Sequence, residues 1–357
     1  MTERVVPIWR RIMKKAKLTA LLLGGVMAAS VFAGCGSVDK NAVAAVFDGQ
    51  EIALGVPNFA ARLQQAQDDD LYAYYFGGNV WNTDLSGTGV TVQDDVKNTV
   101  MDNLFAMYTL EAHMDEYGVT VSEEELTEIS DVASEFLAAN SSEALEELGA
   151  DQEIVEEYLR LLTVQQKMHD AIIAEADTNV SDEEANTSAY SYVRISKTTY
   201  TDEEGKSVEY TEDELKKLAD TVETFAAEAK EGTLEDAAEA RSYTVSQGTF
   251  TADDDILDEK VLTALKGLEE GAVSGVIDTD SAYYVVRLDA KTDAAATEAT
   301  RESIISERET ALYKEVLSGW QESHTWEVKE DVWKDVTFDR LFTTIVPSTE
   351  DAESTEQ

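Results

Sequence analysis

The stretch GLEEGAVSGVIDTDSAYYVVRLD, Gly267–Asp289, decides how the region around it folds. Gly267 and Gly271 can adopt the left-handed backbone conformations that end a helix and open a turn. Val276-Ile277 and Tyr283–Leu288 are apolar, β-branched or aromatic runs, and turn residues separate them. The stretch therefore predicts the end of a helix followed by two strands.

Three stretches further upstream extend this pattern. They are a strand-like run at Tyr190–Ile195, a helix-like run at Phe225–Ala238 and the phrase SQGTF at Ser246–Phe250. In order and spacing, these stretches and Gly267–Asp289 resemble a parvulin-type peptidyl-prolyl isomerase domain. The resemblance implies a sheet of a few strands with helices, an FKBP-like α+β domain that we place at residues 185–292.

The resemblance covers the fold pattern but not the catalytic residues. The family's site uses a histidine on the first strand, a histidine on the last strand, and a cysteine or aspartate between them. By position, Tyr192 and Tyr284 occupy the two histidine places, and Arg241-Ser242-Tyr243 occupies the place of the thiol or acid. All three histidines of the chain lie outside this domain. We therefore assign no catalytic residue.

Four residues of the domain are candidates for substrate binding. They are Tyr192, Tyr284, Phe250 and Val261, the last at the place of the family's proline-pocket aromatic. The first and last strands of a parvulin-like sheet lie side by side, so the two tyrosines should meet at the floor of the former active site. Tyrosine offers a large contact area at little cost in rotamer entropy, which suits a cleft that grips extended chain segments. The alternative is that both rings fill the core as ordinary packing residues.

The first 34 residues have the pattern of an export signal, in which basic residues precede the apolar run Leu18–Gly34. The chain's single cysteine, Cys35, follows small residues at the end of that run. This arrangement resembles a bacterial lipoprotein signal, which implies that Cys35 becomes the lipidated first residue on the extracytoplasmic face of the cell membrane. The alternatives are an uncleaved anchor helix, for which the run is of marginal length, and a buried free cysteine.

The charge of the chain argues against several classes of partner. Its formal net charge is −45, and loss of residues 1–34, with six basic side chains and one acidic one, would make it −50. Nucleic-acid binding requires a basic face that neutralises phosphates, so we predict no nucleic-acid partner. Anionic lipid headgroups would repel the acidic body, which leaves an acyl chain at Cys35 as the membrane attachment.

Helical patterns occupy most of the remaining sequence. Ala42–Leu54 predicts two short strands around an Asp48-Gly49 turn. Val92–Tyr117 has apolar residues at helical spacing and ends at Gly118. After the isomerase-like insert, the chain returns to helix from about Thr297 to Gln321.

The order of these segments is similar to that of extracytoplasmic foldases of the PrsA and SurA type. The similarity implies an α+β protein in which the segment after the isomerase-like domain packs on the N-terminal helices to form one chaperone lobe. The predicted segments are a signal peptide at 1–34, a tether at 35–41, an N-terminal helical segment at 42–180, the isomerase-like domain at 185–292, a C-terminal helix and strand at 296–338, and a disordered acidic tail at 347–357.

Other motifs carry little chemistry. The histidines have no second ligand at metal-binding spacing, and the runs Asp68–Asp70 and Asp253–Asp255 lack the glycine and distal glutamate of a calcium loop, so we predict no metal and no cofactor. An aromatic cluster precedes and enters a glycine-rich loop, and it predicts either an exposed binding surface or a staple that holds the loop. Its members are Tyr72, Tyr74, Tyr75, Phe76 and Trp81.

Together these features predict a lipid-anchored, extracytoplasmic folding factor for unfolded or newly exported polypeptides. Its isomerase-like domain would be weakly active or inactive. One alternative is an envelope lipoprotein that binds or scaffolds one specific partner without general chaperone activity. Another is an active isomerase.

Overall fold

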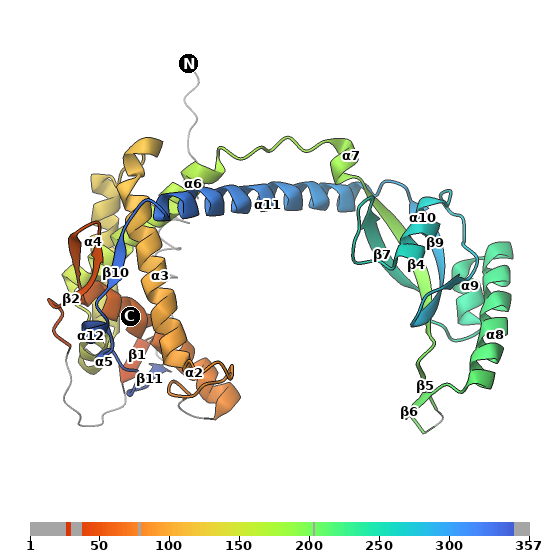
Figure 1. Cartoon of the computed structure of the whole chain (residues 1–357), viewed down its shortest axis with the longest axis horizontal. Helices are drawn as coiled ribbons and strands as arrows, with labels where there is room; N and C mark the ends of the chain where they lie inside the picture. The colour runs from red at the N-terminus through yellow and green to blue at the C-terminus, as the bar shows by residue number, and fades with distance from the viewer. Residues whose placement is uncertain (1–25, 30–37, 78–79, 203, 346–357) are drawn as a thin grey trace, which may run out of the picture. The chain divides into compact units, whose positions relative to one another are not determined.

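The computed structural model describes residues 26–29, 38–77, 80–202 and 204–345 (Figure 1). The described residues form two compact units: those up to Glu175 and from Ala311 onward form unit 1, and those between Ala176 and Thr310 form unit 2. Both helices and sheets are present, so the predicted α+β class is confirmed. Helix α11 (Ala294–Gln321) contributes its first part to unit 2 and its last part to unit 1.

Unit 1 is a helical lobe with short strands. Its helices are α2 (Gly55–Phe76), α3 (Val92–Ala112), the 3₁₀ helix η1 (Met114–Tyr117), α4 (Glu123–Ala139), α5 (Ser142–Leu148), α6 (Gln152–Ile173), the end of α11, and α12 (Glu330–Trp333). Its strands are β1 (Val26–Ala29), β2 (Val43–Phe47), β3 (Gln50–Ala53), β10 (Trp326–Val328) and β11 (Phe342–Ile345). They form two sheets, one with the order β10-β2-β3 and one that pairs β1 with β11.

Local sequence explains most helix starts in unit 1. Thr91 caps α3 through the Asp94 amide, and Ser122 and Glu125 form a capping box at the start of α4. The prediction of one helix from Val92 to Tyr117 is wrong, because α3 ends at Ala112 and η1 follows. The break places the His113 ring within hydrogen-bond distance of Glu116, one 3₁₀ turn later.

The C-terminal segment completes the core of unit 1. Strand β10 pairs with β2, and Trp333, Val336 and Phe338 are buried in the same cluster as Phe59 of α2. The last part of α11 packs on α3 and α6 through apolar side chains, which are Leu312, Tyr313, Val316, Leu317 and Trp320. Each of these contacts removes apolar area from water, which is the main source of stability in such a lobe.

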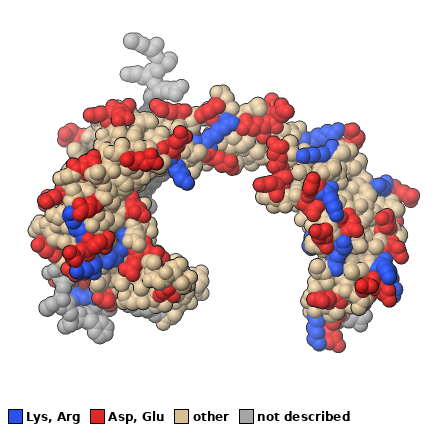
Figure 2. All heavy atoms as spheres, in the orientation of Figure 1, with Lys and Arg blue, Asp and Glu red and all other residues tan. Residues whose placement is uncertain are grey.

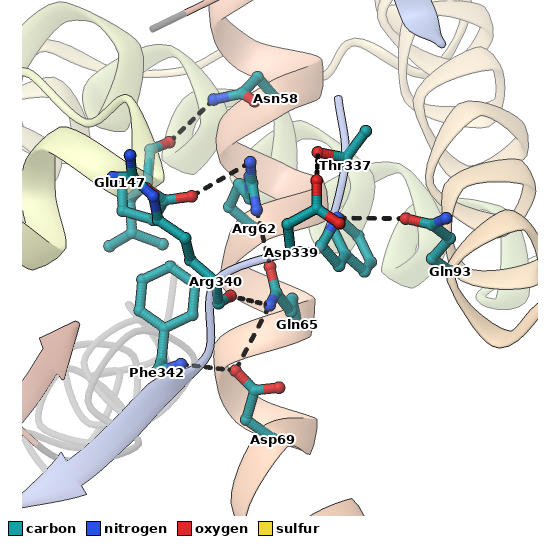
Figure 3. A network of polar contacts seen from close by, with 12 residues as sticks. Asn58, Arg62, Gln65, Asp69, Gln93, Glu147, Thr337, Asp339, Arg340 and Phe342 are labelled. Carbon is teal, nitrogen blue, oxygen red and sulfur yellow. Dashed lines mark hydrogen bonds and ion pairs between the residues drawn. The ribbon is translucent and has the colours of Figure 1, made fainter. Parts of the chain in front are cut away.

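A buried polar network also joins α2 to the C-terminal segment (Figure 3). Arg62 forms an ion pair of 3.2 Å with Glu147 in which both side chains are 9% exposed, and its guanidinium donates to Gln65 at 3.0 Å. Gln65 Nε2 donates to the Arg340 carbonyl at 2.5 Å, and the Phe342 amide donates to Asp69 at 2.7 Å. Burial raises the pKa of Asp69 to about 6 despite these donors.

Unit 2 contains a four-stranded antiparallel sheet of order β7-β4-β9-β8 with helices on both faces. Its strands are β4 (Thr187–Ser196), β5 (Thr199–Thr201), β6 (Ser207–Glu209), β7 (Ser246–Thr251), β8 (Ile277–Asp278) and β9 (Ala282–Ala290), where β5 and β6 form a separate hairpin. Its helices are α7 (Asp182–Ala185), α8 (Glu212–Glu231), α9 (Leu234–Glu239), α10 (Glu259–Lys266) and the start of α11.

Strand alternation gives the sheet of unit 2 two apolar faces. Val193 and Val285 point to one face, where Phe225 of α8 and Leu234 of α9 pack on them. The opposite face carries Tyr190 and Tyr192 of β4 and Tyr284 of β9, and α10 packs against it. Figure 1 shows this sheet with α8 and α10 beside it.

The opening stretch folds largely as predicted. Helix α10 ends before Gly267, and β8 and β9 follow in order. The prediction of a left-handed Gly267 is wrong, since its φ is −87° and the chain continues in a further turn to Leu268. The reversal comes at Gly271, whose φ of +80° only glycine adopts without strain.

Several predicted segments lie wholly or partly outside the described residues. Cys35 and the acidic tail at 347–357 are among these, and so is most of the predicted signal peptide. Within the signal segment, Val26–Ala29 forms β1. The described end of the predicted tether is attached to the lobe, since Lys40 forms an ion pair of 2.5 Å with Asp151.

Candidate functional site

The candidate site is the tyrosine-lined face of the sheet in unit 2. Alternation along β4 places Tyr190, Tyr192 and Arg194 on this face. Because β9 runs antiparallel, Val286 lies opposite Tyr192 and Tyr284 lies opposite Arg194. Tyr284 is therefore the diagonal neighbour of Tyr192, and their ring centroids are 6.2 Å apart.

The structure brings all four sequence-selected residues into one apolar cluster. Phe250 on β7 and Val261 on α10 are 5% and 2% exposed and belong to its buried floor. Tyr192 and Tyr284 are half-buried and pack against that floor. This arrangement leaves part of each phenol open to a ligand, whereas Phe250 and Val261 shape the surface from below.

Tyr190 is a member of the same face that the sequence reasoning did not select. Its ring stacks on Tyr192 with centroids 5.4 Å apart and meets Phe250 edge-on at 5.8 Å. Burial raises the pKa of Tyr190 to about 12, so the phenol stays neutral. The i, i+2 spacing of Tyr190 and Tyr192 in a strand was the signal that could have identified it.

Gly248 on β7 makes room for the Tyr190 ring. It lies opposite Tyr190 in the β4–β7 register, and a Cβ at this position would come within 2.8 Å of two ring carbons. The glycine of the SQGTF phrase therefore has a packing role here. It lets a large ring lie across the neighbouring strand.

Arg194 adds a positive charge at the edge of the tyrosine face. It is exposed, its Nε donates to the Tyr284 hydroxyl at 3.0 Å, and its guanidinium carbon lies 6.0 Å from the centre of that ring. The contact orients the phenol of Tyr284 by a hydrogen bond and a cation–π interaction. Sequence reasoning did not select this residue either, although its i+2 spacing from Tyr192 places it on the same face.

The three residues at the expected place of the thiol or acid belong to the other face of the sheet. Arg241 pairs with Glu228 of α8, and the Tyr243 ring packs edge-on against Phe225 at 5.3 Å. Between them, Ser242 has a left-handed backbone with a φ of 56°. Neither tyrosine of the site therefore has one of these three side chains as its neighbour.

The aromatic cluster at the end of α2 divides into two parts. Tyr72 and Trp81 pack edge-on with centroids 5.1 Å apart, and Trp81 is 1% exposed. Tyr74, Tyr75 and Phe76 are 83%, 69% and 52% exposed. The first pair holds the following loop to the lobe, and the second group forms an exposed aromatic patch.

The described residues show no group of three or more His, Cys, Asp and Glu side chains that could hold a metal ion. His113 and His324 meet in unit 1, whereas His169 packs against Tyr313. In the part of the chain that the structure describes, no helix is both long and apolar enough to cross a membrane.

Sequence comparison now assigns unit 2 to a family. Residues 195–301 match the family described as the PPIC-type PPIASE domain. This part of unit 2 is therefore a parvulin-type peptidyl-prolyl isomerase domain by sequence.

The chain is also similar to individual foldases. It is 25% identical over 266 residues to the "Foldase protein PrsA" of Clostridium botulinum, which covers 69% of this chain and 77% of that protein. Similar solved structures include the PrsA foldase of Lactococcus lactis, with 16% identity and a TM-score of 0.33 over 83% of this chain and 99% of that one. Another is PrsA of Bacillus cereus, with 19% identity and a TM-score of 0.29 over 78% of this chain and 100% of that one.

Proposed function

We propose that the protein is a lipid-anchored folding factor that binds unfolded or newly exported polypeptides on the extracytoplasmic side of the membrane. Its helical lobe holds apolar segments of a client, and its isomerase-type domain is a second contact surface with weak or no isomerase activity. The PPIC-type domain at residues 195–301 and the similarity to a PrsA foldase support this role.

The tyrosine face of unit 2 carries the proposal. Two half-buried phenols, Tyr192 and Tyr284, lie above the floor of Phe250 and Val261, and the resemblance assigns them to the places of the family's histidines. Rapid isomerisation of a prolyl bond requires polar groups that stabilise the twisted amide. Aromatic rings above an apolar floor favour binding of an apolar segment of a client polypeptide instead.

The exposed aromatic patch at Tyr74–Phe76 supports client binding by the lobe. Large exposed apolar groups on a soluble surface commonly mark a binding site. Changing all three residues to serine should reduce client binding without loss of stability, because they contribute exposed area to the folded state. A marked loss of thermal stability in this variant would assign the patch a structural role.

The acidic surface agrees with a polypeptide client and with the absence of a nucleic-acid partner. Figure 2 shows Asp and Glu side chains over much of the visible face of both units, with Lys and Arg interspersed among them. Phosphate backbones would be repelled by such a surface. Its repulsion also keeps the folding factor from associating with itself through exposed rings.

The anchor proposal rests on Cys35 and can be tested by fractionation. Cys35→Ser should yield a protein that leaves the membrane fraction. A variant that stays membrane-bound with its basic N-terminus intact would instead support an uncleaved helix. Cleavage before Cys35 would remove β1. The hydrophobic core of unit 1 should persist without β1, because its described members begin at Val38.

An aggregation assay with several unrelated denatured proteins tests the folding-factor role. Suppression of aggregation of most of these clients is expected, because apolar surfaces are not specific to one sequence. Binding of a single partner, with no effect on unrelated clients, would instead identify an envelope lipoprotein that scaffolds one complex.

A further inference from the structure

A groove runs beside the open edge of β3 in unit 1. In the sheet β10-β2-β3, strand β3 pairs with β2 and has no second neighbour among the described strands. The groove has a volume of about 880 Å³ and is lined by β3 together with side chains of α3, α4 and α6. It lies apart in sequence from the tyrosine face and from the aromatic patch.

The β2–β3 turn determines which backbone groups of β3 face the groove. Asp48 and Gly49 both have positive φ, 49° and 82°, as in a type I′ hairpin turn. In such a hairpin Phe47 and Gln50 form the hydrogen-bonded pair, so the N–H and C=O of the next residue, Glu51, point away from β2. Glu51 is exposed and lines the groove. Its open backbone groups can pair with another strand.

The floor of the groove is apolar. Ile52, Ile129 and Ile154 are 4%, 2% and 8% exposed, and all three line it. Leu126 of α4 is 39% exposed at the same place. An extended ligand beside β3 could bury alternate side chains against these residues.

The rim of the groove is acidic, and its two cations are already paired. Lys40 binds Asp151 at 2.5 Å, and Arg160 binds Glu111 at 2.5 Å and Glu157 at 2.8 Å. Five glutamates and these two cations line the groove, so the lining carries an excess of three negative charges. They are Glu51, Glu111, Glu153, Glu156 and Glu157. Among the described residues, Glu51, Glu153 and Glu156 form no ion pair, and Gln152 donates to Glu156 at 2.6 Å.

We propose that this groove binds an extended polypeptide segment, rich in Lys or Arg and in apolar residues, as an added strand on β3. The inference rests on the proposed function and narrows its client class. The ligand backbone pairs with Glu51, its apolar side chains contact Ile129 and Leu126, and its cations reach Glu51 and Glu153. An acidic segment is repelled by the rim, and a helix has no free backbone groups to offer the strand edge.

Peptide binding to the full chain tests the proposal. The probes are labelled peptides of about eight residues, a usual strand length, that alternate Val with Lys or Val with Glu. The Lys peptide should bind at least about tenfold more tightly, since it can form two or three charge pairs with the acidic rim, which repels the Glu peptide. In two further Lys peptides every second backbone amide is N-methylated, and the methylated positions differ by one residue between the two peptides. Only one of these peptides should bind, because only every second amide of the added strand donates to β3, and methylation of those amides removes the donors.

A matched pair of protein variants locates the binding. Glu51→Lys/Glu153→Lys should abolish the preference for the Lys peptide. Glu135→Lys/Glu146→Lys makes the same charge change at exposed positions outside the groove and should keep the preference. Equal binding of the Lys and Glu peptides, tight binding of both N-methylated peptides, or an unchanged preference in the groove variant would each overturn the proposal.

Aggregation assays with the same proteins separate this inference from the proposed function. Suppression of client aggregation without any preference for the Lys peptide would overturn the groove assignment and leave the folding-factor role intact. Lys-selective binding in the groove without protection of unrelated clients would support the groove and contradict the general role. Stronger peptide binding after removal of residues 1–34 would identify the basic leader as the occupant and overturn the assignment to a partner chain.

Discussion

The Nε2 atoms of His113 and His324 lie 2.9 Å apart, although 211 positions separate the two residues in the chain. His113 Nδ1 lies 2.6 Å from Glu116, and His324 Nδ1 lies 2.6 Å from Asp48. Carboxylates accept hydrogen bonds, so each Nδ1 donates to its carboxylate, and the two Nε2 atoms are left to bond each other. The pair thereby joins the segment after α11 to the lobe.

Replacement of His113 or His324 by glutamine should lower the free energy of unfolding by about 1–3 kcal/mol, because each change leaves a partly buried polar partner unsatisfied. The double variant should cost less than the sum of the two single ones, since both remove the bond between the two rings. His169→Gln, which alters a histidine outside the pair, is the control. Additive losses in urea denaturation would show that the two rings act independently.

The hydrogen bonds of the Asp48 carboxylate predict that the protein loses stability in acid. The Thr325 amide and then the His324 ring hold the pKa of Asp48 down to about 2, below its ordinary value of 3.8. A depressed folded-state pKa gives stability that is present above pH 3.8 and lost as the pH falls toward 2. Asp48→Asn should flatten the decline in unfolding midpoint across this window. The control, Asp102→Asn on the exposed side of α3, should show the same decline as the wild type. An undiminished decline in Asp48→Asn would contradict the assignment of this acid sensitivity to Asp48.

Gly248→Ala should displace the Tyr190 ring, because the added Cβ would lie 2.8 Å from two of its carbons. We expect a loss of about 1–3 kcal/mol in stability, as for overpacking of a core. Gly275→Ala in the same unit is the control, since the nearest atom to a Cβ there would be the Lys230 Nζ at 3.7 Å. Partial recovery of stability in Gly248→Ala/Tyr190→Leu would confirm that the clash with the Tyr190 ring causes the loss. No recovery would show that the loss has another cause.

Tyr192→Phe and Tyr284→Phe should change the rate of prolyl-peptide isomerisation by less than about twofold, since the wild-type rate should already be near background. Restoring histidine at both positions should not give a fast enzyme. Arg241, Ser242 and Tyr243 supply no acid or thiol, and Arg241 and Tyr243 pack against α8 instead. A strong wild-type rate that collapses in either phenylalanine variant would make the tyrosines catalytic.

Local sequence patterns predicted much of the fold. The β-branched run at Tyr283–Leu288 became β9, and the Asp48-Gly49 turn joins β2 to β3. These features depend on neighbours within a few residues, which is why one sequence suffices to find them. The family resemblance supplied the order of the strands and the positions of Tyr192 and Tyr284 on adjacent strands.

Long-range contacts could not be read in the same way. The strand β11 escaped prediction, and its pairing with β1 and the bond from Phe342 to Asp69 join segments far apart in the chain. The meeting of His113 with His324 has the same origin. The groove beside β3 depends on how α3, α4 and α6 pack around a strand edge, and no local motif encodes that.

The most direct measurement is photo-cross-linking from a benzoylphenylalanine placed at position 284 to two unrelated unfolded proteins. The matched control is position 200, where Tyr200 pairs with Tyr210 on the separate β5–β6 hairpin, with ring centroids 4.8 Å apart. The folding-factor role predicts cross-links from position 284 to both clients, with few from position 200. Absence of client cross-links at position 284, or equal yields at both positions, would contradict the role of the tyrosine face in holding polypeptides.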